Sequence, residues 1–211
     1  LVRLDPSGAI TDTLDVGPEP RGLAIDGDGS RAWVARFRSG ESGGEVREVD
    51  LASFAVRDVI PLALDTTTVD GDDRARGLPN YLRQAVLAPD GARVWVPSKK
   101  DNVLRGLFRD GRELTFETTV RTIASRIDPA TGAEVRAEQI DFDNRDSASA
   151  VAFSPLGDYA FVALQGSAEI DIRDTYSGLQ AGAITEVGFA PQGLAPSPDG
   201  RTLFVQSFLS R

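Results

Sequence analysis

The sequence contains no histidine, no cysteine and no methionine among its 211 residues. The chain therefore forms no disulfide, no thiolate zinc site and no copper site with His or Met ligands. Ser-His-Asp and Cys-His catalysis are excluded for the same reason, as is covalent attachment of haem within this chain. Because chemistry here has to rely on carboxylates, arginine, lysine, tyrosine, hydroxyl groups or the backbone, we expect no active centre in this segment.

Positive charge and long apolar runs are also scarce. The net charge of −9 argues against binding to nucleic acid or to an anionic membrane, because both need a basic surface. No apolar run approaches the ~20 residues that span a bilayer, so we expect no membrane insertion. Lysine occurs only as the adjacent pair Lys99 and Lys100.

What the sequence does have is one hairpin pattern in four copies. Each copy has an apolar segment, a turn that contains glycine, and a second apolar segment with an aromatic residue, which is typical of a β-hairpin. The turn glycines are Gly29, Gly91, Gly157 and Gly200, and the aromatic residues that follow at one offset are Trp33, Trp95, Phe161 and Phe204. Four copies indicate a repeat protein, with the aromatic residues packed between the repeats.

A second landmark is an aspartate that opens a turn after a strand of alternating character. It occurs at Asp5, Asp50, Asp128 and Asp174, each followed by another strand. A carboxylate at the first turn position accepts nearby backbone N–H groups, which suits a type I turn. The repeat is thus four strands, A to D, and its shortest steps of 17 and 24 residues together match the ~40–45 of a propeller blade.

The sequence therefore predicts an all-β fold, a β-propeller of four-stranded antiparallel blades with about four blades' worth of strands. The predicted segments are strands C and D of a first blade at 1–18, a blade at 19–64, a blade at 83–140 with insertions at 65–82 and 98–122, a blade at 148–190, and strands A and B of a last blade at 191–211. Either the two end hairpins complete one blade of a four-bladed ring, or the chain is a piece of a larger propeller of about seven blades. We favour the larger propeller.

Both large insertions fall in connections that share one face of a propeller, and insertions gathered on one face usually mark a binding face. We expect them to form one continuous surface for a partner domain or a small anionic ligand. Its predicted apolar anchors are Leu78, Tyr81, Leu107 and Phe108, and its positive charges are Lys99, Lys100, Arg105 and Arg109. The alternative is that the insertions only pack on each other. A double charge reversal of the lysines should weaken partner binding without changing stability if the surface binds.

The first candidate site is the predicted loop after the second hairpin. It contains Lys99, Lys100, Asp101, Asn102 and Arg105. These side chains suit a carboxylate, a sugar acid or an acidic partner surface. The alternative is a solvated loop with local ion pairs worth ~0–1 kcal/mol each.

The second candidate is the acidic segment at 141–146. The oxygens of Asp141, Asp143 and Asp146 could ligate Ca²⁺, which is the one cofactor that the sequence leaves open. Asn144 and Arg145 lie inside the segment, and it lacks the glycine and distal glutamate of an EF-hand. We favour a structural ion-pair cluster around Arg145. A similar, weaker case is the set Asp70, Asp72 and Asp73.

The third candidate is a set of polar residues directly after strands B. It comprises Arg36 with the neighbouring Phe37, Gln165, and the pair Gln206 and Ser207. Such residues would either surround the upper mouth of the central channel or cap strand ends, and blade architecture alone slightly favours capping.

The four hairpin copies, most clearly the segment 191–205, resemble the YVTN-type repeats of lactonase-like and surface-layer β-propellers. The segments 97–102 and 141–146 are similar to large bacterial proteins in which such a propeller precedes a haem-peroxidase-like region. The resemblance implies a periplasmic or extracellular module. Its leading function is non-catalytic binding or scaffolding, presenting loops to a partner domain or ligand. The alternatives are a lactonase-like hydrolase with a carboxylate-bound divalent metal and an electron-transfer accessory of a haem protein.

Overall fold

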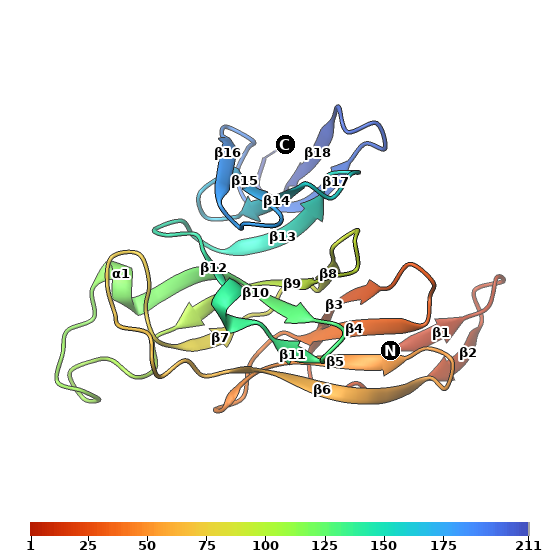
Figure 1. Cartoon of the computed structure of the whole chain (residues 1–211), viewed down its shortest axis with the longest axis horizontal. Helices are drawn as coiled ribbons and strands as arrows, with labels where there is room; N and C mark the ends of the chain where they lie inside the picture. Colours follow the sequence, from red (N-terminus) through yellow and green to blue (C-terminus); the bar gives the residue numbers. More distant parts are fainter. Residues whose placement is uncertain (211) are drawn as a thin grey trace.

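The computed structural model describes residues 1–210, and antiparallel sheets make up most of it. The chain starts with a two-stranded sheet of β1 (Val2–Leu4) and β2 (Ile10–Thr13). A complete blade follows, with the strand order β3 (Pro20–Ile25), β4 (Arg31–Arg36), β5 (Gly43–Asp50) and β6 (Ala55–Ala63). Figure 1 shows these strands as the red and orange part of a curled row of sheets. The predicted fold class is confirmed.

The next blade is the one that carries the insertions. Its centre is the long pair β9 (Val94–Asp101) and β10 (Val120–Asp128). Two short strands, β7 (Leu78–Asn80) and β8 (Val86–Leu87), pair with β9, and two others, β11 (Ala133–Glu134) and β12 (Ile140–Asp141), pair with β10. A 3₁₀ turn at Arg136–Glu138 and the one-turn helix α1 (Phe116–Thr119) complete it.

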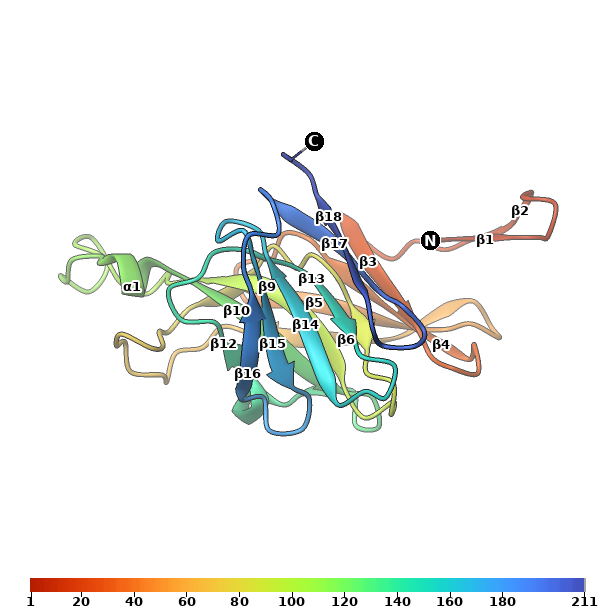
Figure 2. The same cartoon turned by 90° about the horizontal axis from the view of Figure 1, so that it is seen from above.

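A second complete blade consists of β13 (Ala148–Phe153), β14 (Tyr159–Leu164), β15 (Glu169–Asp174) and β16 (Gln180–Ile184). The chain then forms a two-stranded sheet of β17 (Pro191–Pro196) and β18 (Leu203–Ser207). In the described residues β18 does not pair with β1, so the two end hairpins do not complete one blade of a four-bladed ring. Both views show these two hairpins apart from each other (Figures 1 and 2).

The turns form through the aspartate hydrogen bonds and glycine conformations that the sequence predicts. The carboxylates of Asp50, Asp128 and Asp174 each accept a backbone N–H of the following turn at 2.7–2.8 Å. The hairpin glycines adopt positive φ, for example +72° at Gly29, a conformation that costs glycine no steric penalty.

The core lies between the blades. Trp33 and Trp95, the aromatic residues of two strands B, are fully buried in neighbouring clusters. The equivalent Phe204 is 64% exposed because its strand lies in the last, two-stranded sheet. Apolar side chains are also exposed on the first hairpin, at Val2, Leu4 and Ile10. No helix in residues 1–210 is long and apolar enough to cross a membrane.

Candidate functional site

The four strands A begin with the same backbone geometry. Ten residues before each turn glycine the chain adopts a left-handed conformation, at Glu19 (φ 53°), Tyr81 (φ 53°), Ser147 (φ 57°) and Ala190 (φ 56°). A positive φ is unusual for such residues, and a bulky one is a genuine outlier. Because it recurs in all four repeats, it belongs to the repeat and directs each chain segment into its strand A.

The residue two positions after each left-handed residue lines a shared pocket. These residues, each eight before its turn glycine, are Arg21, Arg83, Ser149 and Gln192. All four line one pocket of about 330 Å³, together with Gln84, Ala150, Gly193 and Leu194. Its lining residues come from β3, from the segment just before β8, from β13 and from β17. Strand β3 contacts β8, and β13 contacts β17; Figure 1 labels these four strands. We call this pocket the channel mouth; its lining contains two arginines and no aspartate or glutamate.

A glycine allows the two arginines to lie close together. At Gly22 an added Cβ would lie 2.5 Å from the Cα of Gln84, closer than real Cβ atoms come. Gly22 also has a φ of +84°, which disfavours any other residue. Adjacent strands A can therefore approach closely at this position, and Arg21 of one blade lies beside Arg83 of the next.

Arg83 has an unusual environment. It is half-buried, and no carboxylate lies within 4 Å of its guanidinium in residues 1–210. The other arginines without such a partner in that range are Arg21, Arg109, Arg112 and Arg201, and all four are exposed. Burial, followed by the positive charge of Arg21, lowers the pKa of Arg83 below its usual value. The channel mouth thus holds a partly desolvated cation that forms no ion pair within residues 1–210, its charge being offset only in part by the more distant Asp146 carboxylate.

An aromatic stack fixes the edge of the channel mouth. The guanidinium carbon of Arg21 lies 4.6 Å from the centre of the Phe37 ring, which stacks on Tyr81 at 4.9 Å and an interplanar angle of 10°. The Nζ atom of Lys99 lies 4.3 Å from the Tyr81 ring, and Arg83 lies 5.8 Å from Phe37. Stacking on an aromatic face attracts a cation and limits its rotation. Within the part of the chain that the structure describes, the Arg21 side chain donates no hydrogen bond, so its N–H groups stay available.

The predicted residues after strands B lie near this stack. Phe37, Lys99, Gln165 and Phe208 each follow their turn glycine by eight residues, so they are equivalent in the repeat. The backbone N–H of Phe37 and that of Gln165 donate to Glu19 and Ser147, the left-handed residues that precede strands A. Arg36 forms an ion pair with Glu45 at 3.3 Å. Gln165 and Arg36 therefore flank the channel mouth without lining it.

Sequence reasoning missed the four equivalent residues that line it, one from each repeat. Arg21, Arg83, Ser149 and Gln192 differ in chemistry, so they form no recognisable motif. The signal that was available is their constant distance from the turn glycine. Counting back eight residues in each copy would have identified them as one ring.

The first candidate group is placed differently from the prediction. Lys99, Lys100 and Asp101 belong to β9 and not to a loop. Lys100 is 5% exposed, and its Nζ lies 2.7 Å from the buried Asp65 carboxylate and donates to Gln139 Oε1 at 3.1 Å. Lys100 is therefore not available on a binding surface. Lys99 pairs with Asp101 at 2.8 Å beside the stack.

The remaining members of this group, Asn102 and Arg105, connect the two insertions through hydrogen bonds to Asp70. Asp70 of the first insertion accepts hydrogen bonds from Arg76 at 2.9 Å, Asn102 at 3.2 Å and Arg105 at 3.3 Å. Burial alone would raise the pKa of Asp70, but these donors outweigh it and lower the pKa to about 2. The insertions form one unit, which we call the insertion lobe, defined as residues 65–77 and 102–119.

The four predicted apolar anchors of this lobe lie in different environments. Leu78 is buried and Tyr81 lies in the stack, while Leu107 and Phe108 are exposed. Arg109 is exposed and has no carboxylate within 4 Å in residues 1–210. Of the four predicted anchors, only Leu107 and Phe108 remain on the surface; the lobe also exposes Val69, Leu114 and Phe116.

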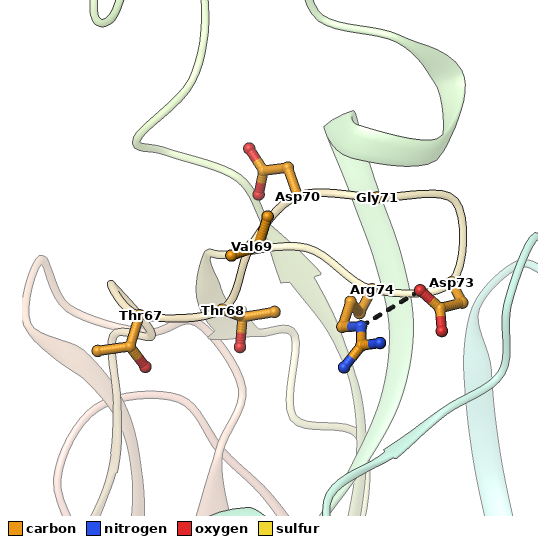
Figure 3. Close-up of a pocket in the computed structure, with 7 residues that line it drawn as sticks. All are labelled: Thr67, Thr68, Val69, Asp70, Gly71, Asp73 and Arg74. Atoms are coloured by element: carbon orange, nitrogen blue, oxygen red, sulfur yellow. Dashed lines mark hydrogen bonds and ion pairs between the residues drawn. The ribbon is translucent and has the colours of Figure 1, made fainter.

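A hollow of about 640 Å³ lies within the first insertion (Figure 3). Thr67, Thr68 and Arg74 line it, and Arg74 pairs with Asp73 at 3.3 Å. Thr68 donates to Asp65 at 2.6 Å, and the Asp70 side chain points away from the loop in the close-up. Because most of these polar groups have partners within the lobe, the hollow is a gap in a loop and not a site.

The acidic segment at 141–146 is an ion-pair cluster around a different arginine. Asp141 and Asp143 contact Arg121 at 2.8 and 3.3 Å, and Asn144 accepts from it at 3.4 Å. Arg121 is 1% exposed, and burial raises the pKa of Asp141. Asp146 accepts instead from the Ser147 hydroxyl at 2.9 Å.

Arg145, the expected centre of that cluster, pairs instead with carboxylates of β15. It pairs with Asp171 at 2.7 Å and Glu169 at 3.1 Å, so the expectation was wrong about which arginine binds the acidic segment. Within residues 1–210 no group of three or more Asp, Glu, His or Cys side chains is arranged to hold a metal ion.

Comparison with known proteins identifies the fold. No family model matches the chain, and no curated protein matches it. Kuenenia stuttgartiensis hydrazine synthase resembles it with a TM-score of 0.75 and 17% identity, over 97% of this chain and 61% of that one. The periplasmic gluconolactonase PpgL of Pseudomonas aeruginosa resembles it with a TM-score of 0.63 and 14% identity, over 97% of this chain and 56% of that one.

The chain thus spans about 60% of the length of these two structures. At such identities the likeness shows the fold alone, a β-propeller-type arrangement of antiparallel blades. The YVTN-type resemblance of the repeats stays a prediction.

Proposed function

We propose that this chain is a non-catalytic binding module that takes an anionic group of its ligand at the channel mouth. The observation that carries the proposal is Arg83, a half-buried cation with no carboxylate within 4 Å in residues 1–210. Burying part of a charge costs free energy unless a partner compensates for it. A ligand carboxylate would supply that partner through charge-assisted hydrogen bonds.

The composition of the channel mouth favours binding over hydrolysis. Metal-dependent hydrolysis of the lactonase-like kind needs carboxylate ligands near the channel, and none of the pocket's lining residues is acidic. The gluconolactonase neighbour shares the fold and keeps the hydrolase as the second candidate. The discriminating observation is turnover of a lactone in the presence of Ca²⁺ or Mn²⁺, which the binding proposal does not predict.

We further propose that the module works outside the cytoplasm, in the periplasm or beyond it. The resemblance of the repeats to surface-layer propellers supports this location, and one structural neighbour is a periplasmic protein. A partner domain would meet the exposed Leu107 and Phe108 at the tip of the insertion lobe. The alternative role as an accessory of a haem protein differs only in the identity of that partner.

A calorimetric titration tests the proposal. The probes are acetate, succinate and inorganic phosphate at low ionic strength, where screening is weakest. We expect Arg83→Gln to lower the affinity for the best probe about 10- to 100-fold, because hydrogen bonds to charged groups are worth about 1.5–3 kcal/mol. The matched control is Arg201→Gln, which removes an exposed arginine on a hairpin turn. Equal affinities in wild type and Arg83→Gln would contradict the proposal.

A further inference from the structure

We infer that the ligand of the channel mouth is a dicarboxylate, an inference that rests on the proposed function. The starting observation is that two arginines, not one, line the pocket without a carboxylate partner. A monoanion would pair with one guanidinium and leave the other uncompensated. A ligand with two carboxylates would pair with both.

The two guanidinium groups lie close enough together for one short ligand to reach both. Their central carbons lie 4.6 and 5.8 Å from the centre of the same Phe37 ring. They are therefore at most about 10 Å apart, which is the sum of the two distances. Each guanidinium can bind one carboxylate in the bidentate geometry that arginine favours. A chain of a few carbon atoms between the carboxylates then bridges the two arginines.

The other polar groups of the pocket add donors. Gln84 uses its side-chain oxygen to accept the N–H of Val151 at 2.8 Å, which leaves its amide NH₂ group to offer. Gln192 forms no side-chain hydrogen bond in residues 1–210. Carboxylates only accept hydrogen bonds, so a pocket rich in free donors matches them better than it matches a neutral or cationic ligand.

The pocket is also held in shape before any ligand arrives. The hydroxyl of Ser149 donates to the carbonyl oxygens of Pro191 at 2.6 Å and Ala163 at 3.2 Å, which ties β13 to β17. Arg21 rests on the stack of Phe37 and Tyr81. Preorganised donors lose little entropy on binding, which raises the affinity for a ligand of matching geometry.

Succinate and butyrate provide the test, because they have the same four-carbon chain and differ in one carboxylate. Both are titrated calorimetrically against wild type, Arg21→Gln, Arg83→Gln, the double variant and the control Arg201→Gln. We expect wild type and the control to bind succinate at least 10-fold more tightly than butyrate. Each single variant should reduce that preference to less than about threefold, and the double variant should bind neither anion.

The outcomes separate this inference from the proposed function. If wild type binds succinate and butyrate equally well, the dicarboxylate assignment falls while anion binding at the channel mouth stands. Inorganic phosphate that binds as tightly as succinate also overturns the assignment, since one tetrahedral ion would then satisfy both arginines. If no anion binds, the proposed function falls and this inference with it. Circular dichroism of each variant confirms that the sheets are intact.

Discussion

The insertion lobe and the channel mouth both contain charged side chains, but only those of the lobe have ion-pair partners within the described residues. In the lobe and beneath it, Lys100 pairs with Asp65, and Arg76 and Arg105 pair with Asp70. At the channel mouth, Arg21 and Arg83 have no carboxylate within 4 Å in residues 1–210. The lobe's charges therefore hold the fold together, whereas we propose that those of the channel mouth bind a ligand.

This difference bears on the first expectation about where the chain binds, which stays untested. The adjacent lysines and the long insertions suggested a binding face, yet Lys100 and the polar side chains around Asp70 are mostly used internally. The lesson is that charge in a loop indicates little by itself. An arginine that the chain leaves without a partner while half burying it is the stronger sign of a ligand site.

The largest expected effect is on the stability of the lobe. Asp65→Ala leaves Lys100 buried without a carboxylate, and breaking a buried pair in this way costs about 3–5 kcal/mol. The unfolding free energy from urea denaturation should fall by this amount. The matched control is Asp73→Ala, which breaks an exposed pair with Arg74 and should cost less than about 1 kcal/mol. Equal losses in the two variants would show that the Lys100–Asp65 pair is not structural.

The second effect is the pH dependence of stability that Asp70 contributes within the lobe. Asp70 has a pKa of about 2 in the folded chain, below the usual value of about 3.9 in an unfolded one. A lowered folded-state pKa stabilises the fold above the unfolded value, and this contribution is lost as the pH falls through the folded one. The stability advantage of wild type over Asp70→Asn should therefore shrink between about pH 4 and pH 2.

Denaturation of both proteins at several pH values measures that advantage. Arg83→Gln serves as the control, because this substitution removes no carboxylate that changes its charge in this range. Its difference from wild type should stay constant while that of Asp70→Asn shrinks. A constant difference for Asp70→Asn would contradict the assignment.

A third prediction concerns the stack that positions Arg21. Phe37→Leu keeps an apolar side chain but removes the ring on which Arg21 lies. Because such contacts are worth about 0.5–1 kcal/mol at exposed sites, the affinity for succinate should fall about two- to fivefold. Calorimetry measures this change. A loss as large as that of Arg83→Gln would mean that Phe37 contacts the ligand directly.

The smallest expected effect is at Lys99. Lys99→Gln removes a partly exposed pair with Asp101 and a contact with Tyr81, so stability should change by less than about 1 kcal/mol. Succinate affinity should change less than twofold, because Lys99 lies at the far end of the stack. A larger loss of affinity would place the binding site on the lysine side of Tyr81.

The fold was predictable because each of its signals is local. The turn glycines, the turn aspartates and the apolar strands recur at spacings that only a blade explains, and the structure forms those turns with the expected hydrogen bonds. The placement of Lys100 was not predictable in the same way. Once 99 and 100 belong to a strand, their side chains point to opposite faces, so one is buried when the other is not.

The sequence also could not predict which side chains pair with each other. Arg121 lies 20 residues before Asp141, and nothing in the sequence distinguishes it from Arg145 as the partner of that carboxylate. The channel mouth is likewise formed by four residues spread from Arg21 to Gln192. Only the repeat position links them, and that link has meaning once the blades are known to surround a common centre.

The most direct test of the central claim compares wild type with Arg83→Gln in two urea denaturation series, without and with succinate. Without succinate, Arg83→Gln should be as stable as wild type or slightly more stable, because it removes a partly desolvated cation beside Arg21. With succinate at about 100 times its dissociation constant, wild type should gain about 2.7 kcal/mol and Arg83→Gln much less. A variant that loses more than about 1 kcal/mol without succinate and then gains as much as wild type with it would show that Arg83 is structural and that the ligand binds elsewhere.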